Sequence, residues 1–343
     1  MKNNCTAPDI VSYRTELMGL AALWIYIFHE WVPLAPNVPV LGFIEGFIKQ
    51  IGFFGVDIFF LLSGMGLIFA IEKHSLATYY KRRFLRVLPP YLIMAVVLMF
   101  VQSWTFPQFL KNLLGITFFT ENMYALLWFV PAITILYLLF PLYDAIFKRI
   151  PNQILLTVGM LALWLVLSLL FKDHMHLDLF GFTNRIPVFL VGVLLGHLTK
   201  EKTLTIPKWM WGVFLLMFVF GLATAYLTNY KGLYLLVPVS NCCVPNFCLA
   251  ISGTFLFTKG MALLERYCKM LGKILLKALS FFGAMSLEFY CVQELVGEKI
   301  KAVFIGKAWD SITNLLMLLG VTLSALLLHF ICRGIQTVLT KKD

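Results

Sequence analysis

Ionisable side chains lie inside segments of this chain that are otherwise apolar. His29 stands near the end of the run LWIYIFHE, and Asp57 lies within GVDIFFLLSG. A charge near the centre of a bilayer costs about 2.5–3.5 kcal/mol even on insertion scales, so such residues mark a functional site or have a partner. An unperturbed histidine has a pKa of about 6.5 and suits a general base. The alternative is a histidine that only packs between helices.

A second group of candidates is basic and lies in YYKRRFLRVLPPY, residues 79–91. Arg83 and Arg86 are three residues apart and share a face of a helix. Arg82 lies beside them. Arginine binds phosphate through two parallel hydrogen bonds, so the segment could hold a phosphorylated ligand. It could equally be a cytoplasmic anchor that contacts anionic lipid. We expect the Pro89–Pro90 pair to begin the next membrane span.

Other polar residues in apolar segments are candidates for the lining of a cavity. Small residues in GFFGVDIFFLLSGMG, including Ser63, allow close helix contact or leave a slot for a thin ligand. No spacing matches a metal-binding, nucleotide-binding or serine-hydrolase motif. The remaining candidates for the lining of such a cavity are Trp128, Arg185, Glu288 and Gln293.

The composition places these residues in a membrane protein. Of the 343 residues, 60% are hydrophobic and 13% are charged, and the mean hydropathy is +0.86. A soluble domain carries about 25% charged residues. Apolar runs long enough to cross a bilayer as helices recur along the chain. We therefore predict an all-α membrane protein, with residues 1–343 forming one polytopic domain.

About ten transmembrane helices in one bundle are predicted, between residues 17 and 336. The sixth of them is short, and the sequence NCCVPNFC interrupts the eighth. The predicted spans are 17–34, 50–71, 88–105, 125–145, 153–171, 185–198, 208–228, 236–258, 278–295 and 313–336.

The distribution of lysine and arginine predicts the orientation. With ten spans and the N-terminus inside, 20 of the 28 basic residues fall on the cytoplasmic side. We therefore expect both termini and residues 73–87 to be cytoplasmic, in a multi-pass protein of the cell membrane. The net charge of +11 then reflects topology, so no nucleic acid partner is predicted. The polar first sixteen residues show no signal peptide.

The order of these segments resembles that of the acyltransferase-3 family of integral membrane acyltransferases, over almost the whole chain. The resemblance is carried by His29, by GVDIFFLLSGM, and by Arg83-Phe-Leu-Arg86 with the prolines that follow. LLWFVPAITILYLLFPL, RIPVFLVGVLLG and SLEFYCVQ are similar to later spans of the family. Two positions depart from its pattern. Eleven residues before His29, Met18 stands where the family has an arginine, and Arg14 is a substitute for that arginine. Gln293 stands where many relatives have a second histidine.

The resemblance implies acyl transfer. Family members move an acetyl or other short acyl group from cytoplasmic acyl-CoA to a hydroxyl of an extracytoplasmic glycan or lipid-linked acceptor. Acyl-CoA is then a donor substrate, and no permanently bound cofactor or metal is implied. Arg82, Arg83, Arg86 and Ser63 become candidates for binding the donor. His29, Asp57 and Arg14 become candidates for catalysis.

From helix depth we predict that Asp57 accepts a hydrogen bond from His29, as the carboxylate of a catalytic triad does. The alternative partners of Asp57 are Arg14, Arg185 and water. Two other functions would use the same buried charges. A transporter or exporter of a small anionic or acylated metabolite would move its substrate without acylating an acceptor. A membrane component of a larger assembly would use these residues for packing.

Overall fold

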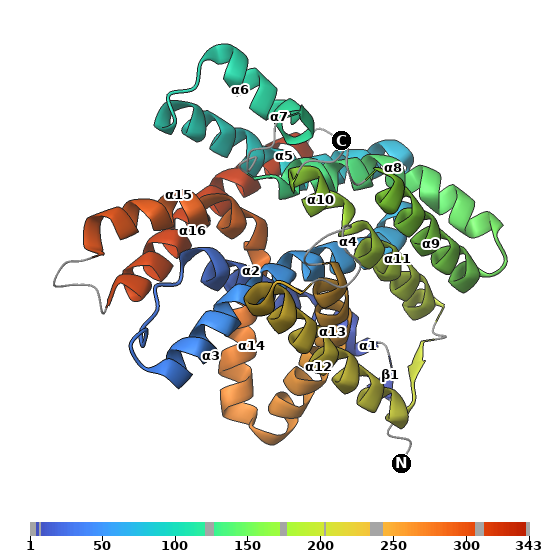
Figure 1. Cartoon of the computed structure of the whole chain (residues 1–343). Helices are drawn as coiled ribbons and strands as arrows, with labels where there is room; N and C mark the ends of the chain where they lie inside the picture. The colour runs from blue at the N-terminus through green and yellow to red at the C-terminus, as the bar shows by residue number, and fades with distance from the viewer. Residues whose placement is uncertain are drawn as a thin grey trace.

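The computed structural model describes residues 5–6, 8–120, 127–171, 177–201, 204–233, 243–305 and 312–340, and these are almost entirely helical (Figure 1). Within them, strand β1 (Cys5–Thr6) pairs antiparallel with β2 (Thr205–Ile206). The helices in chain order are α1 Pro8–Ser12, α2 Arg14–Glu30, α3 Pro39–Gln50, the 3₁₀ turn η1 Ile51–Phe53, α4 Phe54–Lys73, α5 Leu76–Val101, α6 Phe106–Leu113, α7 Ile116–Thr120, α8 Phe129–Arg149, α9 Gln153–Phe171, α10 Leu177–Thr183, α11 Ile186–Lys200, α12 Lys208–Lys231, α13 Cys243–Tyr267, α14 Lys269–Ala284, α15 Ser286–Phe304 and α16 Thr313–Thr340.

Eight helices of the described ranges are long and apolar enough to cross a membrane, and the pair α14–α15 makes nine if it counts as one span. Helix α2 has 17 residues. Many large apolar side chains on the peripheral helices are exposed, for example Leu323 and Leu327 on α16. A bilayer covers such a surface. The all-α membrane class is therefore confirmed, whereas the count of ten spans and their orientation remain predictions.

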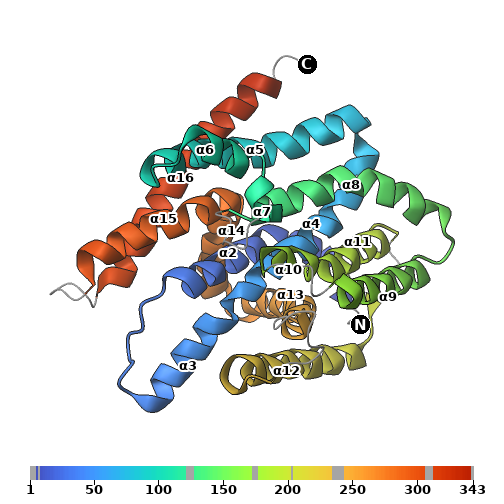
Figure 2. The ribbon, with the colours of Figure 1, turned by 45° about the horizontal axis from the view of Figure 1, so that its top comes forward.

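Helix α4 lies at the centre of the bundle, and glycines bring its neighbours close (Figure 2). A Cβ on Gly192 of α11 would stand 2.2 Å from the carbonyl oxygen of Leu61 on α4. A Cβ on Gly55 of α4 would stand 2.7 Å from the carbonyl oxygen of Ala21 on α2. Such close backbone contact replaces the hydrophobic effect as the main source of helix association in lipid. The small residues in the segment 52–66 therefore serve mainly to let neighbouring helices pack closely.

The predicted ninth span is wrong in shape. Helices α14 and α15 meet at Met285 with a bend of 79°, so residues 278–295 do not form one straight helix. Helix α14 instead crosses the N-terminal end of α2. A Cβ on Gly283 would stand 1.8 Å from the carbonyl oxygen of Thr15, so only glycine permits this crossing. The bend brings the start of α15 beside the start of α2.

The predicted start of the third span at residue 88 is also wrong. Helix α5 begins at Leu76, where the Ser75 hydroxyl accepts a hydrogen bond from the Thr78 N–H, and it includes Pro89 and Pro90. A proline inside a helix leaves the carbonyl four residues earlier without its donor. Gln336 Nε2 donates to the Leu85 carbonyl at 2.9 Å and satisfies that group. The basic segment is thus the first part of a helix, not a loop.

Other ends differ by a few residues. Helix α2 ends at Glu30 rather than residue 34, because Trp31 adopts extended backbone angles. Residues 125–126 and 236–242 of the predicted fourth and eighth spans lie outside the described residues.

Candidate active site

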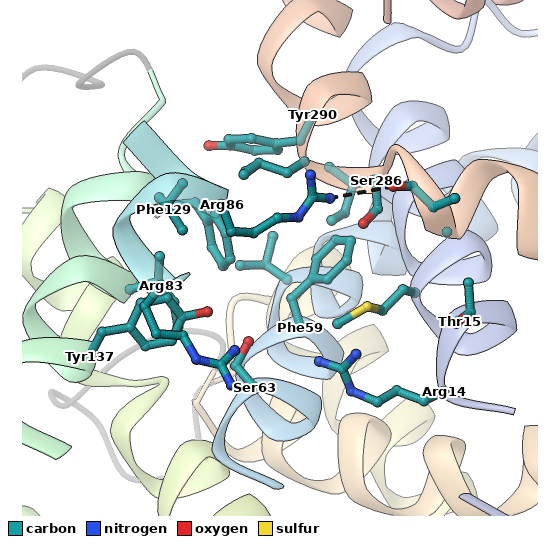
Figure 3. A pocket seen from close by; sticks show the side chains of 18 residues that line it. Arg14, Thr15, Phe59, Ser63, Arg83, Arg86, Phe129, Tyr137, Ser286 and Tyr290 are labelled. Carbon is teal, nitrogen blue, oxygen red and sulfur yellow. Dashed lines mark hydrogen bonds between the residues drawn. The ribbon is translucent and has the colours of Figure 1, made fainter. Parts of the chain in front are cut away.

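A cavity of about 370 Å³ lies between α2, α4, α5, α8 and the α14–α15 bend (Figure 3). Because α2 and α4 run in opposite directions, Arg14 at the start of α2 lies near Ser63, in the middle of α4 (Figure 3). Ile25, near the other end of α2, lies near Val56, early in α4. The cavity therefore extends along about 16 Å of α2, at 1.5 Å per residue. Its lining is Arg14, Thr15, Met18, Ile25, Val56, Phe59, Ser63, Arg83, Arg86, Val87, Phe129, Ile133, Tyr137, Gly283, Ala284, Ser286, Leu287 and Tyr290.

Three arginines line this cavity, and we call the end with Arg14 and Arg83 its basic end. The guanidinium of Arg83 lies 5.7 Å from the centre of the Tyr137 ring. In the described part of the chain, neither Arg14 nor Arg83 forms an ion pair. Two guanidinium groups without carboxylate partners favour a ligand with at least two negative charges. A phosphorylated ligand fits that demand.

The third arginine, Arg86, is held by a buried carboxylate. Its Nη1 donates to Glu288 Oε1 at 2.6 Å, and Glu288 is fully buried. His329 Nδ1 lies 3.3 Å from the same oxygen. Glu288 therefore does not line the cavity itself but fixes the position of a residue that does. The sequence analysis did not single out His329, although it lies inside an apolar run.

A second ionisable pair lies beyond the opposite end of the cavity. His29 Nδ1 is 3.2 Å from Glu294 Oε1, and about a third of each side chain or more remains exposed. His29 lies one helical turn after Ile25, and Glu294 lies one turn after Tyr290. Both Ile25 and Tyr290 line the cavity. The pair therefore continues the line of the cavity, about 22 Å along α2 from Arg14.

The backbone around His29 is held by a buried ion pair. Lys301 Nζ lies 2.9 Å from Glu30 Oε2 and donates to the His29 carbonyl at 3.1 Å. Asn314 donates to the Val32 carbonyl at 2.8 Å. These contacts fix the end of α2 against α15 and α16, so the histidine is presented from a rigid position.

Asp57 has other partners than the predicted His29. Its Oδ2 accepts a hydrogen bond from Asn246 Nδ2 at 3.0 Å and lies 3.6 Å from an Arg185 nitrogen. The Arg185 guanidinium also stacks 4.8 Å from the centre of the Trp128 ring. Asp57 is fully buried and is not among the residues that line the cavity. The alternative partner Arg185 is the one observed, together with Asn246.

Removing one member of this network should destabilise the protein. Arg185→Ala leaves the Asp57 carboxylate buried without its cation, which typically costs about 3–5 kcal/mol. We expect a lower folded yield and a lower temperature of inactivation in detergent. Asp57→Asn keeps the hydrogen-bonding shape and should lose less. Normal thermal stability of Arg185→Ala with abolished turnover would instead place this residue in the reaction.

The structure places only one of three further candidate residues in the cavity lining. Arg82 is exposed on α5 and does not line the cavity, whereas Ser63 does. Gln293 is fully buried outside the cavity, and in the described residues neither of its amide atoms has a hydrogen-bond partner. Of the predicted donor-binding residues, the cavity therefore brings together Ser63, Arg83 and Arg86, with Arg14.

A comparison with protein-family models gave a match over most of the chain. The acyltransferase-3 model, described as an acyltransferase domain, matches residues 17–334. The chain belongs to the acyltransferase-3 family. It is thus a membrane protein of an acyltransferase family. Comparisons with curated proteins and with solved structures gave no match.

Met18, where the resemblance leads us to expect an arginine, lies in the cavity lining of this acyltransferase-3 chain. Met18 and Arg14 are one helical turn apart on α2, and both side chains line the space. The guanidinium of Arg14 is therefore present at the cavity wall. Arg14 lies about 6 Å nearer the basic end of the cavity than Met18 does. Gln293 lies away from the cavity, so this departure leaves the lining unchanged.

One functional candidate of this acyltransferase, Glu294, was missed from the sequence. Glu294 and Tyr290 stand four residues apart on α15, which puts them on one face. Glu294 lies at the end of the predicted ninth span, residues 278–295. A carboxylate at the end of a span resembles an interfacial charge. The four-residue spacing from Tyr290 could have indicated that Glu294 faces the same side of the helix. It could not identify Glu294 as the partner of His29, because that depends on which helix packs beside α2.

Proposed function

We propose that this protein transfers an acetyl or other short acyl group from cytoplasmic acyl-CoA to a hydroxyl of an extracytoplasmic glycan or related acceptor. One observation carries the proposal: the cavity has at one end two arginines that form no ion pair with any described residue, and a His–Glu pair lies beyond its other end. The first end suits a phosphorylated donor, and the second suits proton transfer from an alcohol.

In the proposed reaction the phosphates of CoA contact Arg14 and Arg83, and the thioester lies toward His29. Arg86, held by Glu288, contributes the third guanidinium. A long thin donor is needed, because about 22 Å of α2 separates Arg14 from His29. Acyl-CoA is a substrate in this scheme, and the reaction needs no resident cofactor.

His29 is the proposed general base. Glu294 accepts a hydrogen bond from His29 Nδ1–H and keeps Nε2 free to take a proton. As the acceptor hydroxyl gives its proton to Nε2, its oxygen attacks the thioester carbon. The C–S bond then breaks, the C–O ester bond remains, and the imidazolium returns the proton to the CoA thiolate. No nucleophilic serine or cysteine is required.

Inverted membrane vesicles that contain the native acceptor test this function and its orientation. With radiolabelled acetyl-CoA outside, we expect alkali-labile label in membrane-associated carbohydrate or lipid-linked carbohydrate. A cysteine replacing exposed Ser75, in the α4–α5 connection, should react with an impermeant maleimide in the same vesicles. Right-side-out vesicles should give neither signal.

Two results would contradict the proposal. Label that accumulates in the lumen without ester formation would favour the transporter. Acyl transfer in right-side-out vesicles alone would reverse the proposed orientation. Vesicles without the protein provide the control for other acyltransferases.

A further inference from the structure

Two aromatic side chains line the end of the cavity that is nearer His29. The Phe129 and Tyr290 rings have centroids 5.6 Å apart in an edge-to-face arrangement, and both residues are buried. In Figure 3 they lie on the opposite side of the cavity from Arg14 and Ser63. Because Tyr290 is one turn before Glu294 on α15, this aromatic pair lies beside the path from the cavity to the His29–Glu294 pair.

Packing holds Phe129 in place. Its ring lies 5.3 Å from that of Phe60 and 5.9 Å from that of Phe59. Leu127, two residues earlier, has φ +64°, a left-handed conformation that a leucine adopts only when its surroundings impose it. The first turn of α8 therefore cannot shift easily to admit a larger group.

Little space lies behind the aromatic pair. A small cavity of about 10 Å³ is bounded by Tyr290 and Glu294, with Leu98, Leu127, Cys291 and Leu295. A cavity needs about 10–15 Å³ to hold even one water molecule. This small cavity behind Tyr290 therefore has no room for a longer acyl chain.

We propose that Phe129 and Tyr290 set the length of the transferred acyl group and restrict it to two carbons. This inference rests on the proposed function, and it names the acyl class that the proposed function leaves open. The arginines hold the CoA part at a fixed place, so a longer acyl chain must enter the space that the two rings fill. An extra methylene in an apolar pocket changes selectivity by about 10–200-fold.

The test compares radiolabelled acetyl-CoA and butyryl-CoA in inverted vesicles, at donor concentrations where the initial rate is proportional to concentration. Wild type should use acetyl-CoA at least about tenfold faster. In Phe129→Leu and Tyr290→Leu this preference should fall at least about tenfold. Phe140→Leu is the matched control, because Phe140 is a buried ring on α8 outside the cavity lining. It should keep the wild-type preference.

A second measurement uses wild type alone and does not depend on variant folding. Butyryl-CoA should inhibit acetyl transfer competitively, since its CoA part meets the same arginines, yet be transferred poorly. Equal transfer of both donors by wild type, or an unchanged preference in both leucine variants, would overturn the inference. Those results leave transfer intact, whereas failure of the proposed function removes transfer from either donor.

Discussion

Replacing His29 by alanine should lower acyl transfer by about 10²–10⁴-fold, the usual contribution of a general acid–base group. The side chain is partly exposed, and the ion pair that fixes this end of α2 uses Glu30 and Lys301 instead. The amount of protein in the membrane should therefore remain normal. The measurement is the initial rate in inverted vesicles, divided by the protein amount from immunoblotting.

Glu294→Gln is the informative companion. It keeps the shape of the side chain but no longer favours the His29 tautomer with a free Nε2, so transfer should fall by more than about tenfold. His29→Asn, which cannot accept the proton, should be as inactive as alanine. If His29→Ala keeps more than about a tenth of wild-type activity, the histidine packs and another group is the base.

The sequence predicted the membrane class because each span needs a long apolar run, and that signal is local. Helix ends were harder to predict. Pro89 and Pro90 signal the start of a helix, but Gln336 from α16 satisfies the carbonyl that Pro89 leaves open. The bend at Met285 depends on the glycine crossing of α14 over α2. Both features depend on residues far away in the chain, which local patterns do not contain.

The same distinction applies to the candidate site. Arg83 and Arg86 were predicted to act together because their three-residue spacing is local, and the family resemblance added Ser63. The cavity contains all three. The predicted partner of His29 was wrong. The depth of Asp57 along α4 was estimated from the rise per residue, but depth does not say which way a side chain faces. Asp57 points to α11 and α13, and Glu294 from α15 takes its place.

Replacing either unpaired arginine should weaken use of the donor. Loss of one charge-assisted hydrogen bond costs about 1.5–3 kcal/mol, or about 10–150-fold in the apparent donor constant. We expect this rise for Arg83→Ala and for Arg14→Ala, with a smaller change in the maximal rate. The apparent constant for acetyl-CoA in inverted vesicles is the measurement.

Arg82→Ala is the matched control for Arg83→Ala, because Arg82 is the adjacent arginine on α5 and is exposed outside the cavity. It removes the same charge from the same helix end, so a purely topological role of the basic segment predicts equal effects of both replacements. A cavity that binds the donor predicts an effect of Arg83→Ala alone. Equal rises in the donor constant, or reduced insertion in both variants, would assign the segment to membrane anchoring.

The role of Arg14 can be tested more specifically, because Met18 lines the same cavity one turn further along α2. Arg14→Met removes the guanidinium, and Met18→Arg in the same chain returns it about 6 Å nearer His29. If the cavity needs a charge at this wall, the double variant should recover part of the donor affinity that Arg14→Met loses. If Arg14 only anchors the start of α2, the second change adds a buried charge without a partner, and the double variant should be the less stable of the two.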